Sequence, residues 1–129
     1  MTLGIKNNWV VEFHAEFASE LTEFSVPIRQ KIISFAGLQR TFGPQLGRPQ
    51  VDTLKGSKHS NMKELRFDAD GGVRRIAFAF DLSRKAILLV GGDKAGISKE
   101  KFYRNLIEIA DRRFDLHQAG EAGKKGGKK

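Results

Sequence analysis

The sequence predicts an α+β fold, in which an N-terminal strand and a helical hairpin pack on a small antiparallel β-sheet with a C-terminal helix. Apolar residues recur at helical spacing between residues 13 and 42 and again from residue 102, and they alternate at strand spacing between residues 62 and 92. The 129 residues include ten Phe and no Cys, so the chain is long enough to build one globular core without disulfides.

The first elements are a strand and a helix that follow each other directly. Residues 9–14 (WVVEFH) are β-branched and aromatic, which favours a strand. Apolar side chains then recur at spacings of four, four and three residues, which places them on one face of a helix that ends near Ser25. These side chains are Phe13, Phe17, Leu21 and Phe24.

A second helix is expected over residues 25–43, and the two helices form a hairpin. Pro27 suits the first turn of this helix, and Ser25 is a suitable N-cap. Gly43 before Pro44 marks the end of the helix. Its buried stripe is expected to consist of Ile28, Ile32, Phe35, Ala36 and Phe42.

The second half of the chain predicts an antiparallel meander of three strands and a final helix. After a loop with a short extended segment at residues 51–54, the strands are expected at residues 62–67, 73–81 and 85–92, separated by the turns DADGG and LSR. The last strand is apolar almost throughout, as expected of a strand that is covered on both faces. Ser98 opens the final helix, and apolar residues such as Phe102, Leu106, Ile109 and Ala110 form its stripe.

The net charge of the chain indicates what kind of partner it binds. The chain carries a net charge of +8, and residues 1–119 still hold 19 basic against 14 acidic side chains, a balance of +5. A basic domain of this kind favours a polyanionic partner.

We expect residues 1–119 to form a single domain and residues 120–129 (GEAGKKGGKK) to form a disordered basic tail. With no Cys, no apolar run of about 20 residues and no signal-peptide pattern, we expect a cytoplasmic protein without a membrane span.

Strand alternation predicts a basic face. Large apolar residues of the middle strands share one face, which should meet the helices, so Arg66 and Arg75 lie on the opposite face above the small Ala77 and Ala79. Guanidinium groups over such a floor suit a phosphate backbone. The alternative is that Arg66 pairs with Glu64 or another acid and that Arg75 only solubilises an exposed face.

The segments LKGSKHSNMKELRF, GGVRRIAFAFD, AILLVGGDKAG and KEKFYRNLIEIADRRF together resemble the RelE/ParE toxin superfamily, and within it the HigB-like, phage-derived branch. The resemblance covers residues 9–117. It implies the toxin of a type II toxin-antitoxin pair with a RelE-like fold. It further implies a ribosome-dependent endonuclease that cuts mRNA in the ribosomal A site without a metal or other cofactor, by attack of a 2′-hydroxyl on the adjacent phosphate. The implied partner is a helix-turn-helix antitoxin, in a hetero-oligomer with the toxin.

The resemblance also implies a set of site residues. The candidates for catalysis are Lys55, Lys58, Arg66 and Tyr103, and those for binding RNA phosphates are Arg75, Lys94 and His59, although His59 has no firm counterpart in the family. The sequence departs from the family pattern where Asp93 stands beside Lys94, and where Arg74 replaces an aromatic residue as a second, outward base.

The residue types suit cleavage of a phosphodiester. Arg and Lys stabilise a dianionic phosphorane, and a lysine crowded by like charges should have a lowered pKa, so that Lys55 or Lys58 provides a neutral amine as base. Tyr103 either stacks on a base or orients the phosphate, or else simply completes the packing of its helix. His59 lies in a loop without an identified partner, while His14 and His117 are expected to be inert. No acid lies at ligand spacing from these histidines, so no metal site is predicted.

Two other functions share this sequence pattern. A gyrase-poisoning toxin of the ParE type has the same fold but acts by binding, and a nucleic-acid-binding module would tolerate the loss of any one residue. The arrangement of Lys55, Arg66 and Tyr103 favours the nuclease.

Overall fold

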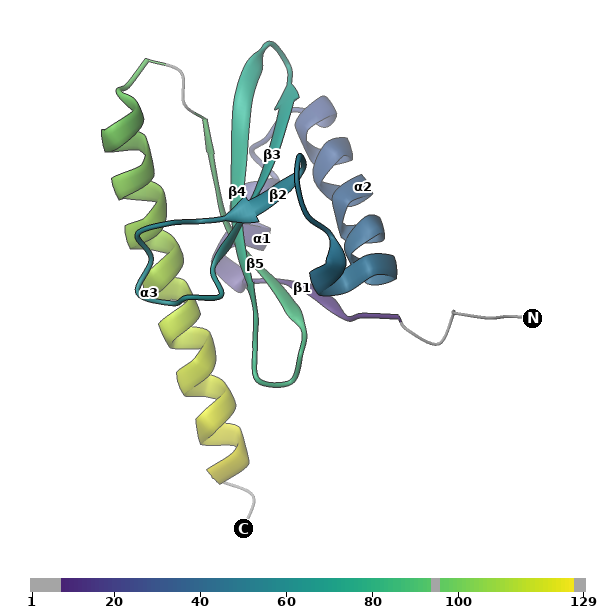
Figure 1. Ribbon diagram of the computed structural model, residues 1–129, viewed down its shortest axis with the longest axis vertical. Helices are drawn as coiled ribbons and strands as arrows, with labels where there is room; N and C mark the ends of the chain where they lie inside the picture. Colours follow the sequence, from purple (N-terminus) through teal and green to yellow (C-terminus); the bar gives the residue numbers. More distant parts are fainter. Residues whose placement is uncertain (1–7, 94–95, 127–129) are drawn as a thin grey trace, which may run out of the picture.

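A computed structural model describes residues 8–93 and 96–126 of the chain, which form a five-stranded sheet with helices on both faces (Figure 1). The strand order is β1-β5-β4-β3-β2. In chain order the elements are β1 Val11–Phe13, α1 Ala15–Leu21, α2 Val26–Phe42, the 3-10 turn η1 Gly43–Gln45, β2 Val51–Thr53, β3 Lys63–Ala69, β4 Gly72–Phe80, β5 Ala86–Asp93 and α3 Lys99–Gly126. The predicted α+β class is confirmed, and the short segment that the sequence predicts to be extended within a loop is a fifth strand, β2.

The sheet is mixed, whereas the sequence predicts an antiparallel one. Strands β2 to β5 pair antiparallel, and the short strand β1 adds to the exposed edge of β5 in parallel, with Val11 opposite Ala86. The turn between β3 and β4 is a two-residue hairpin at Asp70 and Gly71, both of which have positive φ, at 54° and 76°. This geometry suits the Asp-Gly pair and fixes the register of β3 on β4.

The helical hairpin covers one face of the sheet. Helix α1 ends at Leu21, four residues before the predicted end, yet Phe24 still packs edge-on against Phe17, with 6.1 Å between ring centroids. Large residues of β3, β4 and β5 meet α1 and α2 in one core cluster, as predicted. Its fully or nearly fully buried members are Phe17, Ile28, Ile32, Phe35, Val51, Leu65, Ile76, Phe78, Ala86 and Leu88.

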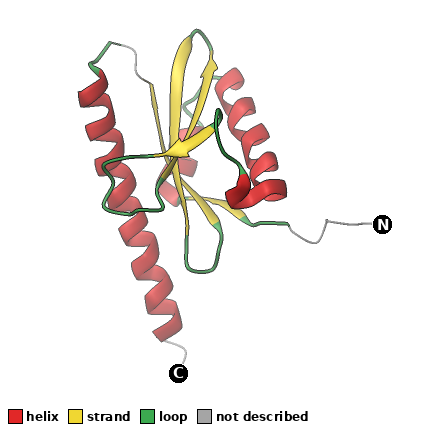
Figure 2. Cartoon of the chain, in the orientation of Figure 1, coloured by secondary structure: helices red, strands yellow, loops and turns green. Residues whose placement is uncertain are grey.

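The opposite face of the sheet is covered by α3, so the predicted open floor of alanines is wrong. Ala77 and Ala79 are fully buried and pack in a second core cluster with Phe102, Leu106 and Phe114 of α3. The small side chains make room for the helix to approach the sheet, since larger ones would overpack the interface. Figure 2 shows the result, with α3 and α2 on opposite sides of the sheet. Residues 86–89 of β5 are buried and alternate between the two core clusters, as expected of a strand that is covered on both faces.

Helix α3 runs to Gly126, where the sequence predicts a disordered tail from residue 120. Ser98 caps this helix, because its Oγ accepts a hydrogen bond of 3.1 Å from the backbone amide of Lys101. The contiguous helix therefore brings Glu121 into the folded part of the chain, whereas residues 127–129 lie outside the described residues. In the part of the chain that the structure describes, no helix combines the length and the hydrophobicity needed to cross a membrane.

Candidate nucleic-acid interface

A polar cavity of about 410 Å³ opens where β2, β3 and β4 meet the first turns of α3. Four cationic side chains line it against two carboxylates, so its net charge is positive. The lining residues are Asp52, Thr53, Leu54, Lys55, Glu64, Arg66, Arg75, Lys99 and Tyr103. Four of the seven predicted site residues, Lys55, Arg66, Arg75 and Tyr103, thus lie together.

A hydrogen-bonded group of three side chains forms one wall of the cavity. The Tyr103 hydroxyl donates to Glu64 Oε1 at 2.9 Å and accepts from Arg75 Nε at 3.1 Å. The Arg75 and Glu64 side chains are only 11% and 9% exposed, and Arg75 Nη1 donates to the Arg74 carbonyl at 2.9 Å. The opposite charges of the Arg75 guanidinium and the Glu64 carboxylate offset the free-energy cost of burying each of them. The tyrosine is therefore a fixed part of the wall and not only a packing residue.

Tyr103 is held in its neutral form. Burial raises the pKa of its phenol above the ordinary value; the hydrogen bond from Arg75 acts in the opposite direction, and the hydrogen bond to Glu64 again raises the pKa. At neutral pH the hydroxyl is therefore a donor and an acceptor, never a phenolate base.

The pKa of Tyr103 gives a direct test of this wall. The chain has a single tyrosine, so an ultraviolet titration follows Tyr103 alone, and we expect a midpoint above the ordinary value of about 10. Because the folded-state pKa is raised, the stabilisation by the neutral phenol is complete below about pH 10 and is lost as pH rises through the folded-state value. Glu64→Gln should lower the midpoint. A midpoint at or below that of free tyrosine would show that the hydroxyl is not held as described.

Arg66 is the more accessible of the two arginines that line the cavity. It is 38% exposed, and its Nη1 lies 3.8 Å from Asp52 Oδ2, which Arg48 Nε also approaches at 3.7 Å. These long, solvent-screened contacts hold Arg66 loosely. Its acidic neighbour is thus Asp52, whereas Glu64, the partner considered from the sequence, serves Arg75 and Tyr103.

A second cavity continues the first across the sheet. It has a volume of about 390 Å³, and Arg66 and Arg75 line both cavities. Arg48, Pro49, Phe67 and Asp68 complete its lining. The two cavities form a groove with arginines along its length, which matches the repeating negative charge of a nucleic-acid backbone.

Lys58 and His59 do not line this groove; they attach their loop to α3. Lys58 Nζ lies 2.6 Å from Asp115 Oδ2, and His59 Nε2 lies 2.8 Å from Asp115 Oδ1. The hydrogen bond to Asp115 raises the pKa of Lys58, contrary to the lowered value that the sequence predicts for a catalytic lysine there. Asp111 accepts hydrogen bonds from the Ser57 hydroxyl and the Lys58 amide, so two acids of α3 hold the loop.

The turn after β5 is only partly described. Lys94, a predicted phosphate-binding residue, lies outside the described residues. Arg74, which the sequence suggests as an outward base, contacts Asp93 Oδ2 at 2.7 Å and is largely covered, with 16% of its side chain exposed.

Several residues of the groove and its surroundings escape sequence reasoning. Asp52 and Lys99 join the cavity through β2 and the first turn of α3, and Asp115 lies 56 residues from His59. Glu64 is the exception, because strand alternation places it on the same face of β3 as Arg66, and the sequence therefore indicates an acid in the groove.

The other two histidines have partners that the sequence does not predict. His14 caps α1, because its Nδ1 accepts a hydrogen bond of 3.1 Å from the Glu16 amide. Burial lowers the pKa of His14, which favours the neutral ring that this cap requires. His117 Nε2 lies 2.8 Å from Asp81 Oδ2, an acid 36 residues away in the chain, which a search for acids at ligand spacing in the sequence does not find.

Comparison with known proteins identifies the family. A family model described as "Phage derived protein Gp49-like (DUF891)" matches residues 19–115, which include every residue of the groove. The chain is 54% identical over 81 residues to a Mycobacterium tuberculosis protein named "Putative toxin HigB3"; the match covers 63% of this chain and 68% of that protein. It is 50% identical over 78 residues to another protein of this organism, "Putative toxin HigB2", a match that covers 60% of this chain and only 38% of the relative. The resemblance to the HigB-like, phage-derived branch is confirmed, and the chain belongs to the family of Gp49-like phage-derived proteins.

Proposed function

We propose that this protein is the toxin of a type II toxin-antitoxin module and that it cleaves mRNA on the ribosome. The observation that carries the proposal is the groove, in which Arg66, Arg75, Lys55 and Tyr103 converge within the region matched by the family model. The toxin names of two relatives that are 54% and 50% identical support the same class of function. The groove has phosphate-binding donors along its length, which a nuclease requires and a purely protein-binding inhibitor does not.

The proposed reaction is transfer of a phosphodiester to the neighbouring ribose. The 2′-oxygen attacks the adjacent phosphorus, its proton passes to a base, the bond from phosphorus to the 5′-oxygen breaks, and the leaving oxygen takes up a proton. The products are a 2′,3′-cyclic phosphate and a 5′-hydroxyl end. This sequence of steps needs stabilisation of a dianionic phosphorane, a base and an acid, all of which side chains can supply.

The exposure of each side chain suggests its role. Arg66, the more accessible guanidinium, binds the equatorial oxygens of the phosphorane through its fork of donors. Arg75 and Tyr103, which hydrogen-bond to each other, orient the scissile phosphate. Lys55 is exposed at the cavity and is our candidate for the base. We assign Lys58 and His59 to holding the loop that carries Lys55, and we keep Lys94 as a candidate for binding a phosphate.

The two loop lysines form a matched pair for mutagenesis. We expect Lys55→Gln to lower the rate of mRNA cleavage by a factor of about 10²–10⁴, the usual contribution of general acid-base catalysis. Lys58→Gln should retain activity within about threefold, because its ammonium group pairs with Asp115 outside the groove. Single-turnover cleavage in a reconstituted translation reaction measures both rates. The opposite ranking of the two variants would remove Lys55 from the mechanism.

The proposed partners are a helix-turn-helix antitoxin, bound in a hetero-oligomer, and mRNA in the ribosomal A site of the cytoplasm. Controlled expression without the antitoxin, followed by mapping of mRNA ends, tests the function as a whole. We expect growth arrest and new 5′ ends inside translated reading frames. Growth arrest with DNA-damage signalling and no new ends would indicate a gyrase poison, and full growth would indicate a binding module; either result would overturn the nuclease proposal.

A further inference from the structure

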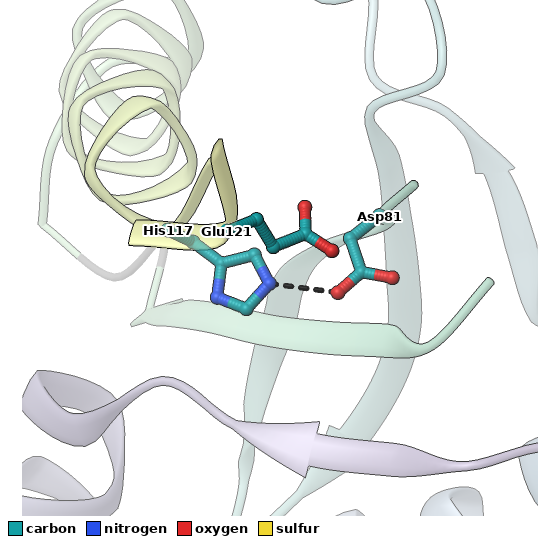
Figure 3. A group of neighbouring side chains, drawn as sticks. All are labelled: Asp81, His117 and Glu121. Atoms are coloured by element: carbon teal, nitrogen blue, oxygen red, sulfur yellow. Dashed lines mark hydrogen bonds and ion pairs between the residues drawn. The ribbon is translucent and has the colours of Figure 1, made fainter. Parts of the chain in front are cut away.

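The side chains of Asp81, His117 and Glu121 lie close together (Figure 3). They lie where the turn between β4 and β5 meets the C-terminal half of α3, whereas the groove lies at the first turns of this helix. Asp81 follows β4 in the turn to β5, and His117 and Glu121 lie one helical turn apart on α3. One ligand atom from each residue lies within 4.8 Å of those of the other two. None of the three lines the groove with Arg66 and Arg75. His117 and Glu121 also lie beyond the residues that the family model matches, so this cluster is a feature of this chain and not of the family's matched core.

The carboxylate of Asp81 is buried and held in one orientation by backbone amides. Its side chain has no exposed surface, and its Oδ1 accepts hydrogen bonds from the backbone amides of Ser83 at 2.9 Å and Lys85 at 2.8 Å. Its other oxygen, Oδ2, faces His117 Nε2. Hydrogen bonds of this type to one carboxylate oxygen fix the direction of the other, as the outer partners of metal ligands do.

Glu121 supplies a second observation, a buried carboxylate oxygen beside Asp81. Its Oε2 accepts from the Ser83 hydroxyl at 3.2 Å, whereas Oε1 is buried and has no hydrogen-bond partner among the described residues. A buried carboxylate oxygen without a partner is costly, and it lies next to a second carboxylate. Lys85, a cation that lines the same cavity as Glu121, contacts Glu12 at 3.2 Å. A cation between Asp81, His117 and Glu121 would satisfy the unpaired oxygen.

We propose that Asp81, His117 and Glu121 bind a divalent transition-metal ion, with Zn²⁺ as the best match. One imidazole and two carboxylates favour Zn²⁺ over Mg²⁺ and Ca²⁺, which prefer oxygen ligands alone. With ligand bonds of about 2.0–2.2 Å, two ligands of a tetrahedral Zn²⁺ stand about 3.3–3.6 Å apart. The His117 and Asp81 atoms, now 2.8 Å apart, need to separate by about 0.5–0.8 Å.

The surroundings leave room for a fourth ligand and suggest what the ion does. An open cavity of about 470 Å³ is lined by His117 and Glu121 together with Ser83, Lys85, Glu12 and other residues, so a water molecule can reach the ion. Because Asp81 and the two helical ligands belong to different elements, the ion would pin α3 to the β4–β5 turn. Its role is structural, and it is independent of the proposed nuclease function.

Metal titration of the full chain, freed of any affinity tag and of bound metal, tests this proposal. We expect one Zn²⁺ per chain by calorimetry, and a rise in Tm of roughly 10 °C at a free Zn²⁺ concentration of about 100 times Kd. Co²⁺ should give the visible absorption of a four- or five-coordinate site, and Mg²⁺ should not raise Tm.

Matched variants separate this site from general surface binding. Glu121→Gln keeps the size of the side chain and should weaken Zn²⁺ binding by a factor of about 10–100 or more, and His117→Gln should do the same. Glu12→Gln removes a carboxylate of the same cavity and should bind as the wild type does. Circular dichroism verifies that each variant is folded. No saturable binding by the wild type, or equal affinity in Glu121→Gln, would overturn the proposal, whatever the outcome of the nuclease assays.

Discussion

Arg66→Ala is expected to lower ribosome-dependent mRNA cleavage by a factor of about 10²–10³, the cost of removing one preorganised donor to a developing charge. The guanidinium lines both cavities of the groove and is 38% exposed, so it is accessible to a phosphate. Its contact with Asp52 is long, at 3.8 Å, and little folding energy should depend on it. Cleavage of a defined mRNA by purified toxin on programmed ribosomes measures the effect, and thermal unfolding checks the fold.

Two further variants make this result specific. Arg40→Ala removes an exposed arginine of α2, on the other side of the sheet, and should cleave as the wild type does. Arg66→Lys retains the charge but not the planar fork of donors, so we expect an intermediate rate. Wild-type cleavage by Arg66→Ala would remove the arginine from the mechanism and leave the groove without its main phosphate ligand.

Phe114→Ala is expected to lower the free energy of unfolding by about 3–5 kcal/mol, as for other fully buried aromatic residues. Phe114 has no exposed surface and packs edge-on against the ring of His59, with 4.9 Å between centroids. It belongs to the core cluster that joins α3 to Ala77 and Ala79. Its loss therefore leaves a cavity where α3, the His59 loop and the sheet meet.

Leu116→Ala, two residues farther along α3, is the control. Leu116 is 54% exposed, and its truncation should change stability by no more than about 0.5 kcal/mol. Urea denaturation followed by circular dichroism gives both values. Equal losses in the two variants would contradict the packing of α3 on the alanine face of the sheet.

Much of the fold follows from local sequence patterns. Four local patterns each predict a single local structure, and the structure contains all four. They are the Asp70-Gly71 turn, the continuous apolar run of β5, the helical spacing of Ile28, Ile32 and Phe35, and the glycine that ends α2. Where the conformational preferences of the residues and the spacing of the apolar positions agree, the sequence is sufficient to predict the helix, strand or turn.

The arrangement of elements across the sheet is less accessible to sequence reasoning. Alternation correctly places Ala77 beside Arg75 on one face, but small residues suit either an open surface or a closely packed helix. Only the position of α3 decides between these, and it depends on contacts between residues far apart in the chain. The parallel pairing of β1 with β5 has the same origin.

The site shows a similar division. Strand alternation in the sequence predicts that Arg66 and Arg75 lie on one face of the sheet, and they do. Asp115, by contrast, lies more than fifty residues along the chain from Lys58 and His59, the two residues that it holds. The composition of residues 120–129 suggests disorder, but α3 continues to Gly126 and so places Glu121 near Asp81. In each case the missing information is the three-dimensional partner of a charged group.

The most direct test of the proposed mechanism is cleavage of an mRNA in which the nucleotide on the 5′ side of the cut carries 2′-deoxyribose. Without the 2′-hydroxyl the attacking oxygen is absent, so we expect the purified toxin on programmed ribosomes to leave this mRNA intact, while it cuts the all-ribose mRNA to give a 2′,3′-cyclic phosphate end. Cleavage of the deoxy-substituted mRNA at the same position and rate would contradict attack by the neighbouring 2′-oxygen and, with it, the roles assigned to Lys55 and Arg66.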